Sequence, residues 1–287
     1  MPEGNPDLSL IDIHFHAGPD IYRRKYTTRE AAKRFADING WAVIKSHLGS
    51  TAAQTWEARQ EGLPVSGAVV LNELAGGLKP QTVEQSLFAH GEDTPARLMV
   101  YLPTLGITNH KSKLHRETFH SRINLDQQNS QPLFDPNGHP SNALKRTLSS
   151  MGGAPVVLAT GHCNREDSHR VIEEALSAGI EKIVLTHATH PMSGFSVEDI
   201  ADLAQEESVY IELTALTLQQ RHQEIQHMAD LLAANPRLIL SSDFGQEDKP
   251  SPGEYRRLSR SWANDLEISE AGYQQMTLKN PRELLGL

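Results

Sequence analysis

SLIDIHFH, residues 9–16, is the stretch that decides the fold: an apolar, β-branched run that ends in two histidines. Residues two apart on a strand face the same side, so His14 and His16 project together while Phe15 faces the opposite way. A helical pattern follows over residues 28–39. This order predicts a strand-then-helix unit with two imidazoles at the carboxyl end of its strand.

Seven similar units follow along the chain. Further strands are expected at 41–47, 65–71, 97–102, 156–160, 182–186, 209–213 and 237–242, and helices at 51–61, from Pro80, and at 141–150, 166–178, 197–207, 219–234, 255–265 and 269–285. Strands that alternate with helices predict a parallel sheet with right-handed crossovers. Eight units predict an α/β fold, a single (β/α)8 barrel of the TIM type. An open dinucleotide-binding sheet is disfavoured because no GxGxxG follows the first strand.

The regular alternation is interrupted once, after the fourth expected strand. Residues 103–139 are polar, rich in His, Asn, Gln and Asp, and only weakly periodic. Loops of this length in a compact domain are usually lids, binding loops or disordered segments. We therefore expect one barrel domain over 1–287 with a lid or substrate loop inserted at 103–139.

Composition narrows the class of protein. Hydrophobic residues make up 38% and charged residues 22% of the 287, which suits a soluble globular chain without a membrane span or signal peptide. Cys163 is the only cysteine, so a cytoplasmic location is expected and no intrachain disulfide can form. A net charge of −9 without a basic stripe argues against nucleic acid as a partner. The expected partner is a small-molecule substrate, and a homo-oligomer remains open.

Ligand-type side chains end most of the expected strands. In chain order they are His14 and His16, Lys45 and His47, His162, His187, and Asp243. In a parallel barrel these ends meet at one face. A single such histidine is more often a hydrogen-bonded structural residue. Several imidazoles together are poor core residues and good ligands for a borderline divalent metal, which indicates a metal site.

The predicted site has three groups of residues. Metal ligands are expected among His14, His16, His47, His162, His187 and Asp243, catalytic roles for Asp243 and Lys45, and substrate contacts from Glu73, Thr104, His110, His190, Glu212 and Gln246. The alternatives for Lys45 are pairing with a carboxylate, binding a substrate anion, carboxylation to bridge two metals, or extension to solvent. Glu73 is either a bridging carboxylate or a solvated loop residue. Histidines on helical patterns, among them His90, are expected to be solvated.

These motifs resemble the amidohydrolase superfamily, and most closely a largely uncharacterised branch of it. The matching segments are HFHAGPD (14–20), IKSH (44–47), YLPT (101–104), TGH (160–162), THATHP (186–191), SDFGQ (242–246) and NPRELLGL (280–287). The resemblance implies a barrel with one or two divalent metals, usually zinc, with manganese or iron as alternatives. By position it gives His14, His16, His162, His187 and Asp243 ligand or near-ligand roles.

The chain departs from this pattern at the fourth strand. Common binuclear members carry a carboxylated lysine or a glutamate there, whereas this chain has Leu102-Pro103-Thr104. Either Lys45, His47 or Glu73 substitutes for that residue, or the site holds one metal.

The expected activity is hydrolysis of an amide, cyclic amide, lactone or ester by metal-activated water. Asp243 would orient the water and accept its proton, and Lys45 or a histidine would polarise the scissile carbonyl. The insertion residues Asn109, His110 and Lys111 are expected to close over the substrate. Three alternatives remain: metal-dependent non-oxidative decarboxylation, a metabolite-binding barrel without catalysis, and a metal-free hydrolase.

Overall fold

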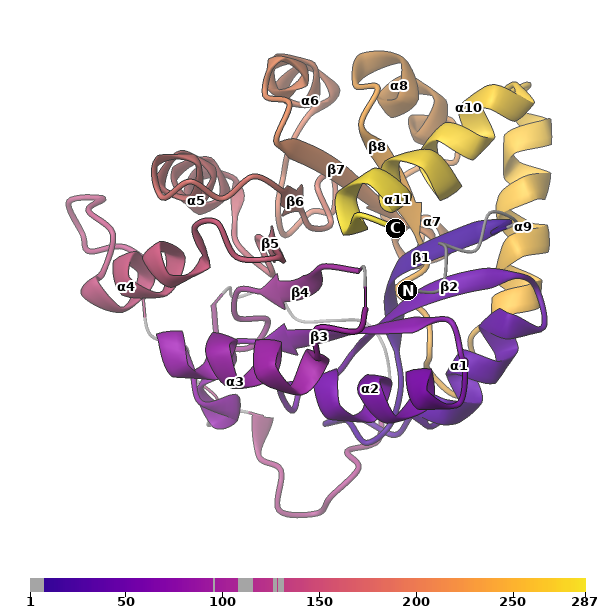
Figure 1. Ribbon diagram of the computed structural model, residues 1–287. Coiled ribbons are helices and arrows are strands. Elements are labelled where there is room, and N and C mark those ends of the chain that lie inside the picture. Colours follow the sequence, from indigo (N-terminus) through magenta and orange to yellow (C-terminus); the bar gives the residue numbers. More distant parts are fainter. Residues whose placement is uncertain (1–7, 95, 108–115, 126–127, 129–131) are drawn as a thin grey trace.

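A computed structural model describes residues 8–94, 96–107, 116–125, 128 and 132–287 of the chain. Eight strands pair side by side in chain order, and each neighbouring pair is parallel (Figure 1). The strands are β1 (Leu10–His16), β2 (Gly40–Lys45), β3 (Val65–Val70), β4 (Leu98–Tyr101), β5 (Val156–Ala159), β6 (Ile183–Leu185), β7 (Val209–Thr214) and β8 (Leu238–Ser241). The (β/α)8 barrel predicted from the sequence is confirmed.

Helices lie around the outside of the strands (Figure 1). They are α1 (Thr28–Ala36), α2 (Ala52–Gln60), α3 (Pro80–His90), α4 (Asn142–Met151), α5 (Arg165–Ser177), α6 (Val197–Asp202), α7 (Ala215–Gln219), α8 (His227–Ala234), α9 (Pro252–Asp265), α10 (Glu270–Gln274) and α11 (Asn280–Leu285). Helix α1 shows why they form: Thr27 and Glu30 make a capping box at its start. Its residue Phe35 packs edge-on against Phe15 at 5.2 Å, so Phe15 faces the helices as expected.

The seam between β1 and β8 closes the barrel. The backbone N–H of Asp243 donates to the carbonyl of His14 at 2.9 Å, and the N–H of His16 donates to the carbonyl of Phe244 at 2.8 Å. Below them, Asp12 Oδ1 accepts the N–H groups of His14 and Ser242, both at 3.1 Å. Burial raises the pKa of Asp12 to about 6. Closure therefore uses the residues that end both strands.

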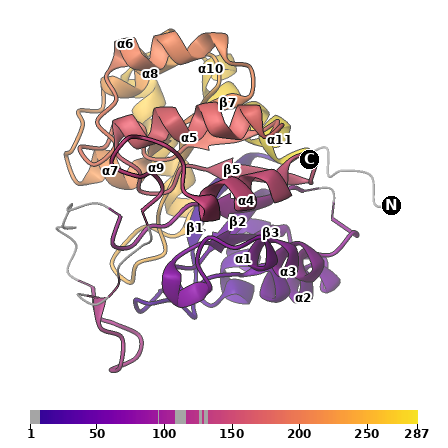
Figure 2. The same ribbon diagram turned by 90° about the vertical axis from the view of Figure 1, so that its left-hand side faces the viewer.

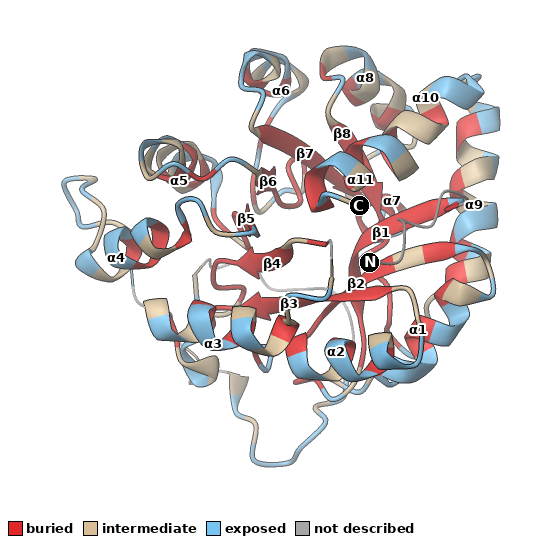
Figure 3. Ribbon diagram, viewed as in Figure 1, coloured by how far each residue is buried: buried red, intermediate tan, exposed pale blue. Residues whose placement is uncertain are grey.

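The barrel interior is filled by side chains. Its buried cluster includes Ile13, Val43, Val70, Met99, Tyr101, Val157, Val184, Tyr210 and Ile239, with Leu284 and Leu285 of α11 packed against it. Figure 3 shows the strands buried along nearly their whole length, with Trp41 of β2 partly exposed. Because the interior holds no space for a ligand, chemistry is confined to the strand ends and the loops that follow them.

One helix boundary differs markedly from the sequence prediction. A single helix was expected over 219–234, but α7 ends at Gln219 and α8 begins at His227. Thr214 caps α7 by accepting the N–H of Thr217, which sets the start of the helix early. Arg221 then adopts a positive φ of 54°, which a continuing helix does not allow. The turn that results brings Gln220 to the cavity described below.

The described part of the insertion lies between β4 and α4, at the end of the barrel opposite the C-terminus (Figure 2). Part of it is fixed to the loop between β1 and α1. Arg23 N–H donates to the carbonyl of Glu117 at 2.9 Å, and Phe119 N–H donates to that of Ile21 at 2.7 Å. Residues 116–119 are therefore held to the barrel by main-chain pairing. The lid function of the insertion stays a prediction. None of the helices described is long and apolar enough to cross a membrane.

His90 corrects an expectation for histidines on helices. It ends α3 and is buried, with its Nε2 accepting the N–H of Gly67 at 3.3 Å. Arg59 donates to its backbone carbonyl. Burial lowers the pKa of His90 to about 4, so the folded protein holds it neutral at pH 7. It was expected to be solvated because the helix pattern gives no sign of the backbone N–H of Gly67 that becomes its hydrogen-bond partner.

His90→Gln tests this burial. An unfolded imidazole takes up a proton below about pH 6.5, whereas the folded one resists until about pH 4, so its contribution to stability falls as pH drops through that window. Urea unfolding should show that the stability difference between wild type and variant changes by about 2 kcal/mol between pH 7.5 and 4.5. The exposed His120→Gln is the control. A wild-type-to-variant difference that stays constant with pH would contradict the prediction.

Candidate active site

The carboxyl ends of the strands surround one cavity that is open to solvent. Its lining residues are His16, Lys45, His47, Arg116, His162, His187, His190, Met192, Leu216, Thr217, Gln220 and Asp243. The structure thus brings together most of the residues predicted as ligands or catalytic groups. His14 lies directly behind them and is fully buried.

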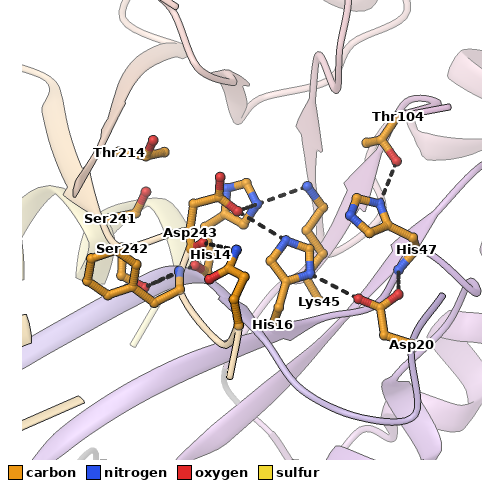
Figure 4. A network of polar contacts seen from close by, with 12 residues as sticks. His14, His16, Asp20, Lys45, His47, Thr104, Thr214, Ser241, Ser242 and Asp243 are labelled. Carbon is orange, nitrogen blue, oxygen red and sulfur yellow. Dashed lines mark hydrogen bonds and ion pairs between the residues drawn. The ribbon is translucent and has the colours of Figure 1, made fainter. Parts of the chain in front are cut away.

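His14 is oriented by a buried carboxylate. Its Nδ1 lies 2.9 Å from Glu212 Oε1. Its Nε2 lies 3.3 Å from Asp243 Oδ1, and Figure 4 shows these two side chains next to each other. Burial opposes ionisation of Glu212, but electrostatic attraction to His14 and hydrogen bonds from His14 and Ser241 outweigh it and lower the pKa of Glu212. An ionised Glu212 can only accept, so Nδ1 carries a proton and Nε2 is left facing Asp243.

His16 has a partner for either tautomer. Its Nε2 lies 3.1 Å from Asp243 Oδ1. Its Nδ1 lies 3.0 Å from Arg24 Nη2 and 3.4 Å from Asp20 Oδ2. If Nδ1 accepts from Arg24, Nε2–H donates to Asp243. If Nδ1 donates to Asp20, Nε2 is free to bind a metal.

Asp243 and His187 are both held in an unusual backbone conformation. Their φ angles are 55° and 51°, in the left-handed region that non-glycine residues rarely adopt. His187 Nε2 lies 3.9 Å from Asp243 Oδ2, and its backbone N–H donates to Glu212 at 3.1 Å. Backbone strain of this kind concentrates at functional sites. Here the backbone conformation directs both side chains toward the carboxyl end of β1, just after β6 and β8 end.

The donor atoms fit one metal ion. Ligand atoms of His14, His187 and Asp243 all lie within 4.8 Å of one another. His187 Nδ1 is buried and has no hydrogen-bond partner among the described residues. Burial lowers the pKa values of His16, His47, His162 and His187 well below the ordinary range, which keeps these imidazoles neutral as metal ligands must be.

A second cluster, made of His16, Asp20 and His47, is a poorer metal site. Asp20 already accepts from Arg24 Nε at 2.7 Å and from Arg24 Nη2 at 2.6 Å. It also accepts the backbone N–H groups of Ile21 and His47, both at 2.7 Å. A carboxylate that is neutralised and hydrogen-bonded in this way offers little to a cation.

Lys45 is fully buried and does not extend to solvent. Its Nζ lies 2.9 Å from His14 Nε2 and 4.2 Å from the centre of the Tyr101 ring. Burial lowers the pKa of Lys45 to about 8, although the charges of Asp243 and Glu212 act in the opposite direction. The ammonium is therefore positioned against the site, with the ring face of Tyr101 as a further partner.

Three of the predicted substrate contacts lie behind the cavity lining. Glu212 holds His14, Thr104 Oγ1 lies 2.8 Å from His47 Nδ1 (Figure 4), and Gln246 donates to the backbone carbonyl of Asp243 at 3.0 Å. His190 lines the cavity, whereas Glu73 is exposed and absent from the lining. His110, Asn109 and Lys111 lie outside the described residues. Direct substrate contact by these residues stays a prediction.

Sequence reasoning missed several residues that complete the site. Asn72 was passed over for its neighbour Glu73, yet it is buried and accepts the N–H of Thr104 at 2.8 Å. Asp20 and Arg24 were not singled out, although Asp20 stands within the HFHAGPD segment. Arg116 reaches the cavity from the insertion. No local pattern marks an arginine in a polar loop as a site residue.

Comparison with known proteins supports the fold. The sequence pattern of a family of unknown function (DUF6282) matches residues 9–212. No curated protein matches the chain. The solved structure of 2,6-dihydroxybenzoate decarboxylase complexed with 2,6-dihydroxybenzoate is similar, with 10% identity and a TM-score of 0.52 over 98% of this chain and 100% of that chain. Amidohydrolase 2 from Bifidobacterium longum subsp. infantis gives 11% identity and a TM-score of 0.43, over 97% of this chain and 98% of that chain.

Gly245 allows the β1–β8 seam to close next to Asp243. Its φ is 121°, and a Cβ there would overlap the carbonyl oxygen of His16. Gly245→Ala should therefore lower the free energy of unfolding by about 2 kcal/mol or more, because it adds a backbone clash to the cost of the left-handed conformation. Gly194→Ala is the matched control, since Gly194 also has a positive φ but has nothing within 4 Å of the added carbon. Equal losses in urea unfolding of the two variants would contradict the clash.

Proposed function

The chain belongs to the DUF6282 family of unknown function, and we propose that it is a metal-dependent enzyme that activates water to cleave a C–N or C–O bond of a small molecule. One observation carries the proposal. The carboxylate of Asp243 contacts Nε2 of both His14 and His16 while 15% of its side chain remains exposed. A carboxylate shared between two imidazoles at the cavity surface is suited both to hold a metal and to handle a proton.

We propose a single divalent ion, with zinc first and manganese or iron as alternatives. His14, His187 and Asp243 would hold it, with His16 or His162 completing the set. Imidazole and carboxylate donors suit these metals. One ion is favoured over two because Arg24 already neutralises Asp20, and because β4 leads into Leu102-Pro103-Thr104 without a carboxylate.

The chain's own side chains supply the rest of the chemistry. A bound divalent ion would supply a water molecule whose pKa is lowered to about 7. Asp243 would orient the attacking water and accept its proton, and its partial exposure would let it pass the proton to the leaving group. Glu212 keeps His14 in the tautomer that presents Nε2. The buried ammonium of Lys45 stabilises negative charge that develops on the substrate oxygen.

Decarboxylation is the second candidate. It is favoured by two cations in the cavity lining, Lys45 and Arg116, which would receive a substrate carboxylate. The similar fold belongs to a decarboxylase crystallised with 2,6-dihydroxybenzoate, a likeness that concerns the fold alone.

Metal content is the first test of the proposal. Wild-type protein purified without chelator or nickel affinity resin should carry about one equivalent of zinc, manganese or iron by elemental analysis. His14→Ala/His16→Ala should lose it, because both substitutions remove an Nε2 that faces Asp243. His120→Ala/His139→Ala removes two exposed imidazoles and should retain the metal. Wild-type protein that contains no metal and binds none when metal is added would contradict the proposal.

Asp243→Asn separates proton handling from folding. In a screen of amides, lactones and esters, the variant should lose about 100-fold or more in kcat, because an amide cannot accept the proton of the water. Asp248→Asn, a substitution of an exposed carboxylate in the same loop, should keep full activity. Full activity in Asp243→Asn would contradict the assigned role. Release of CO2 from hydroxylated benzoates, with none of the other substrates cleaved, would favour decarboxylation.

A further inference from the structure

The charge on the cavity lining is unbalanced. Lys45 and Arg116 are its cations, and five further lining residues are imidazoles. Asp243 is the one carboxylate among the lining residues that the structure describes. Met192 and Leu216 supply an apolar surface in the same cavity. Such a lining fits a ligand with an anionic group on an organic body.

Arg116 is fixed in place by the main chain around it. Its neighbours 117–119 pair with residues 21–23 through the two hydrogen bonds described above and through a β-bridge between Tyr22 and Thr118. The Arg116 guanidinium lies 4.1 Å from the centre of the Tyr22 ring. Stacking on an aromatic face holds a guanidinium plane while leaving its edge free to donate. The side chain is thus preorganised at the cavity wall.

Arg116 has no anionic partner within the described part of the chain. No carboxylate there lies within 4 Å of its guanidinium, and its Nε is buried without a hydrogen-bond partner. Arg24, the other arginine near the site, differs because Asp20 accepts from it at 2.6 Å and 2.7 Å. An arginine does not lose its charge in proteins, and the half-buried guanidinium of Arg116 feels the charges of Asp243 and Asp20 without touching either carboxylate. Among the described residues, the guanidinium is therefore available to an anion that enters the cavity.

We propose that Arg116 is the anion receptor of this site and that the substrate is a small molecule bearing a carboxylate or a phosphate. The planar fork of a guanidinium matches both groups and binds them through two parallel hydrogen bonds. Met192 and Leu216 would contact the body of the molecule. The inference rests on the proposed function only in taking this cavity as the active site. It assigns a residue of the insertion to substrate selection.

Calorimetric titration with simple probes tests this assignment. Benzoate, its neutral isostere benzamide, and inorganic phosphate are titrated into wild type, Arg116→Gln, Arg116→Lys and Arg122→Gln. Arg122 is an exposed arginine of the same insertion and serves as the matched control. Metal content and thermal unfolding are measured for every preparation, and the titrations are repeated after treatment with a chelator.

The wild type should bind benzoate or phosphate and discriminate against benzamide. Arg116→Gln should weaken anion binding by about tenfold or more, the loss expected for hydrogen bonds to a charged group. Arg116→Lys should fall between the two because it keeps the charge without the fork. Arg122→Gln should match the wild type. Tighter binding of benzoate assigns a carboxylate, and tighter binding of phosphate assigns a phosphate ester.

Three results would overturn the inference: benzamide bound as tightly as benzoate, neither anion bound by the wild type, or anion affinity unchanged in a folded Arg116→Gln. The comparison of benzoate with benzamide needs only the wild type, so it decides even if a variant fails to fold. A protein without metal that still binds anions through Arg116 contradicts the proposed function alone. A metal-bearing protein whose anion binding ignores Arg116 contradicts this inference alone.

Discussion

The backbone hydrogen bonds that close the barrel between β1 and β8 are the constraint on which the site depends. They join the carbonyl of His14 to Asp243 N–H at 2.9 Å and His16 N–H to the carbonyl of Phe244 at 2.8 Å. Three of these four residues also supply the side chains that converge on the cavity. The backbone contacts that close the barrel therefore also place the side chains of the candidate site. The close approach of Gly245 to His16 is one of these contacts.

Burial makes the polar residues of the site depend on one another. Glu212 is fully enclosed, and its charge is stabilised by His14 and by Ser241, which donates to it at 2.8 Å. Lys45 is enclosed as well and is stabilised by Asp243 and Glu212. Removing one member leaves an opposite charge without compensation, which costs more than the contact itself was worth. Asp to Asn keeps the size and shape of the side chain but removes its charge, so the stability of such a variant has to be measured beside its activity.

The barrel and the gathering of His16, Lys45, His47, His187 and Asp243 followed from the sequence, because strand direction fixes which residues meet at a parallel edge. The sequence did not predict which of two neighbouring loop residues faces the site. Asn72 turns inward and Glu73 outward, and that choice is made by the 3₁₀ turn Glu73–Ala75, not by residue type. His90 was misplaced for a similar reason, since the space that buries it lies beside a glycine on a neighbouring strand.

Arg116 could not have been predicted as a site residue from the sequence. The reason also concerns how substitutions in the insertion can alter what the cavity binds. The segment that carries it pairs with residues 21–23 through main-chain groups, which leave no signature in side-chain pattern. Main-chain pairing also tolerates substitution of the side chains it presents. The strands can then keep the donor set constant while the insertion changes what the cavity recognises. In the proposed function, the strand ends carry the chemistry and the insertion carries substrate selection. The two parts are joined by backbone hydrogen bonds next to His47 and Tyr22, whose rings lie 6.1 Å apart.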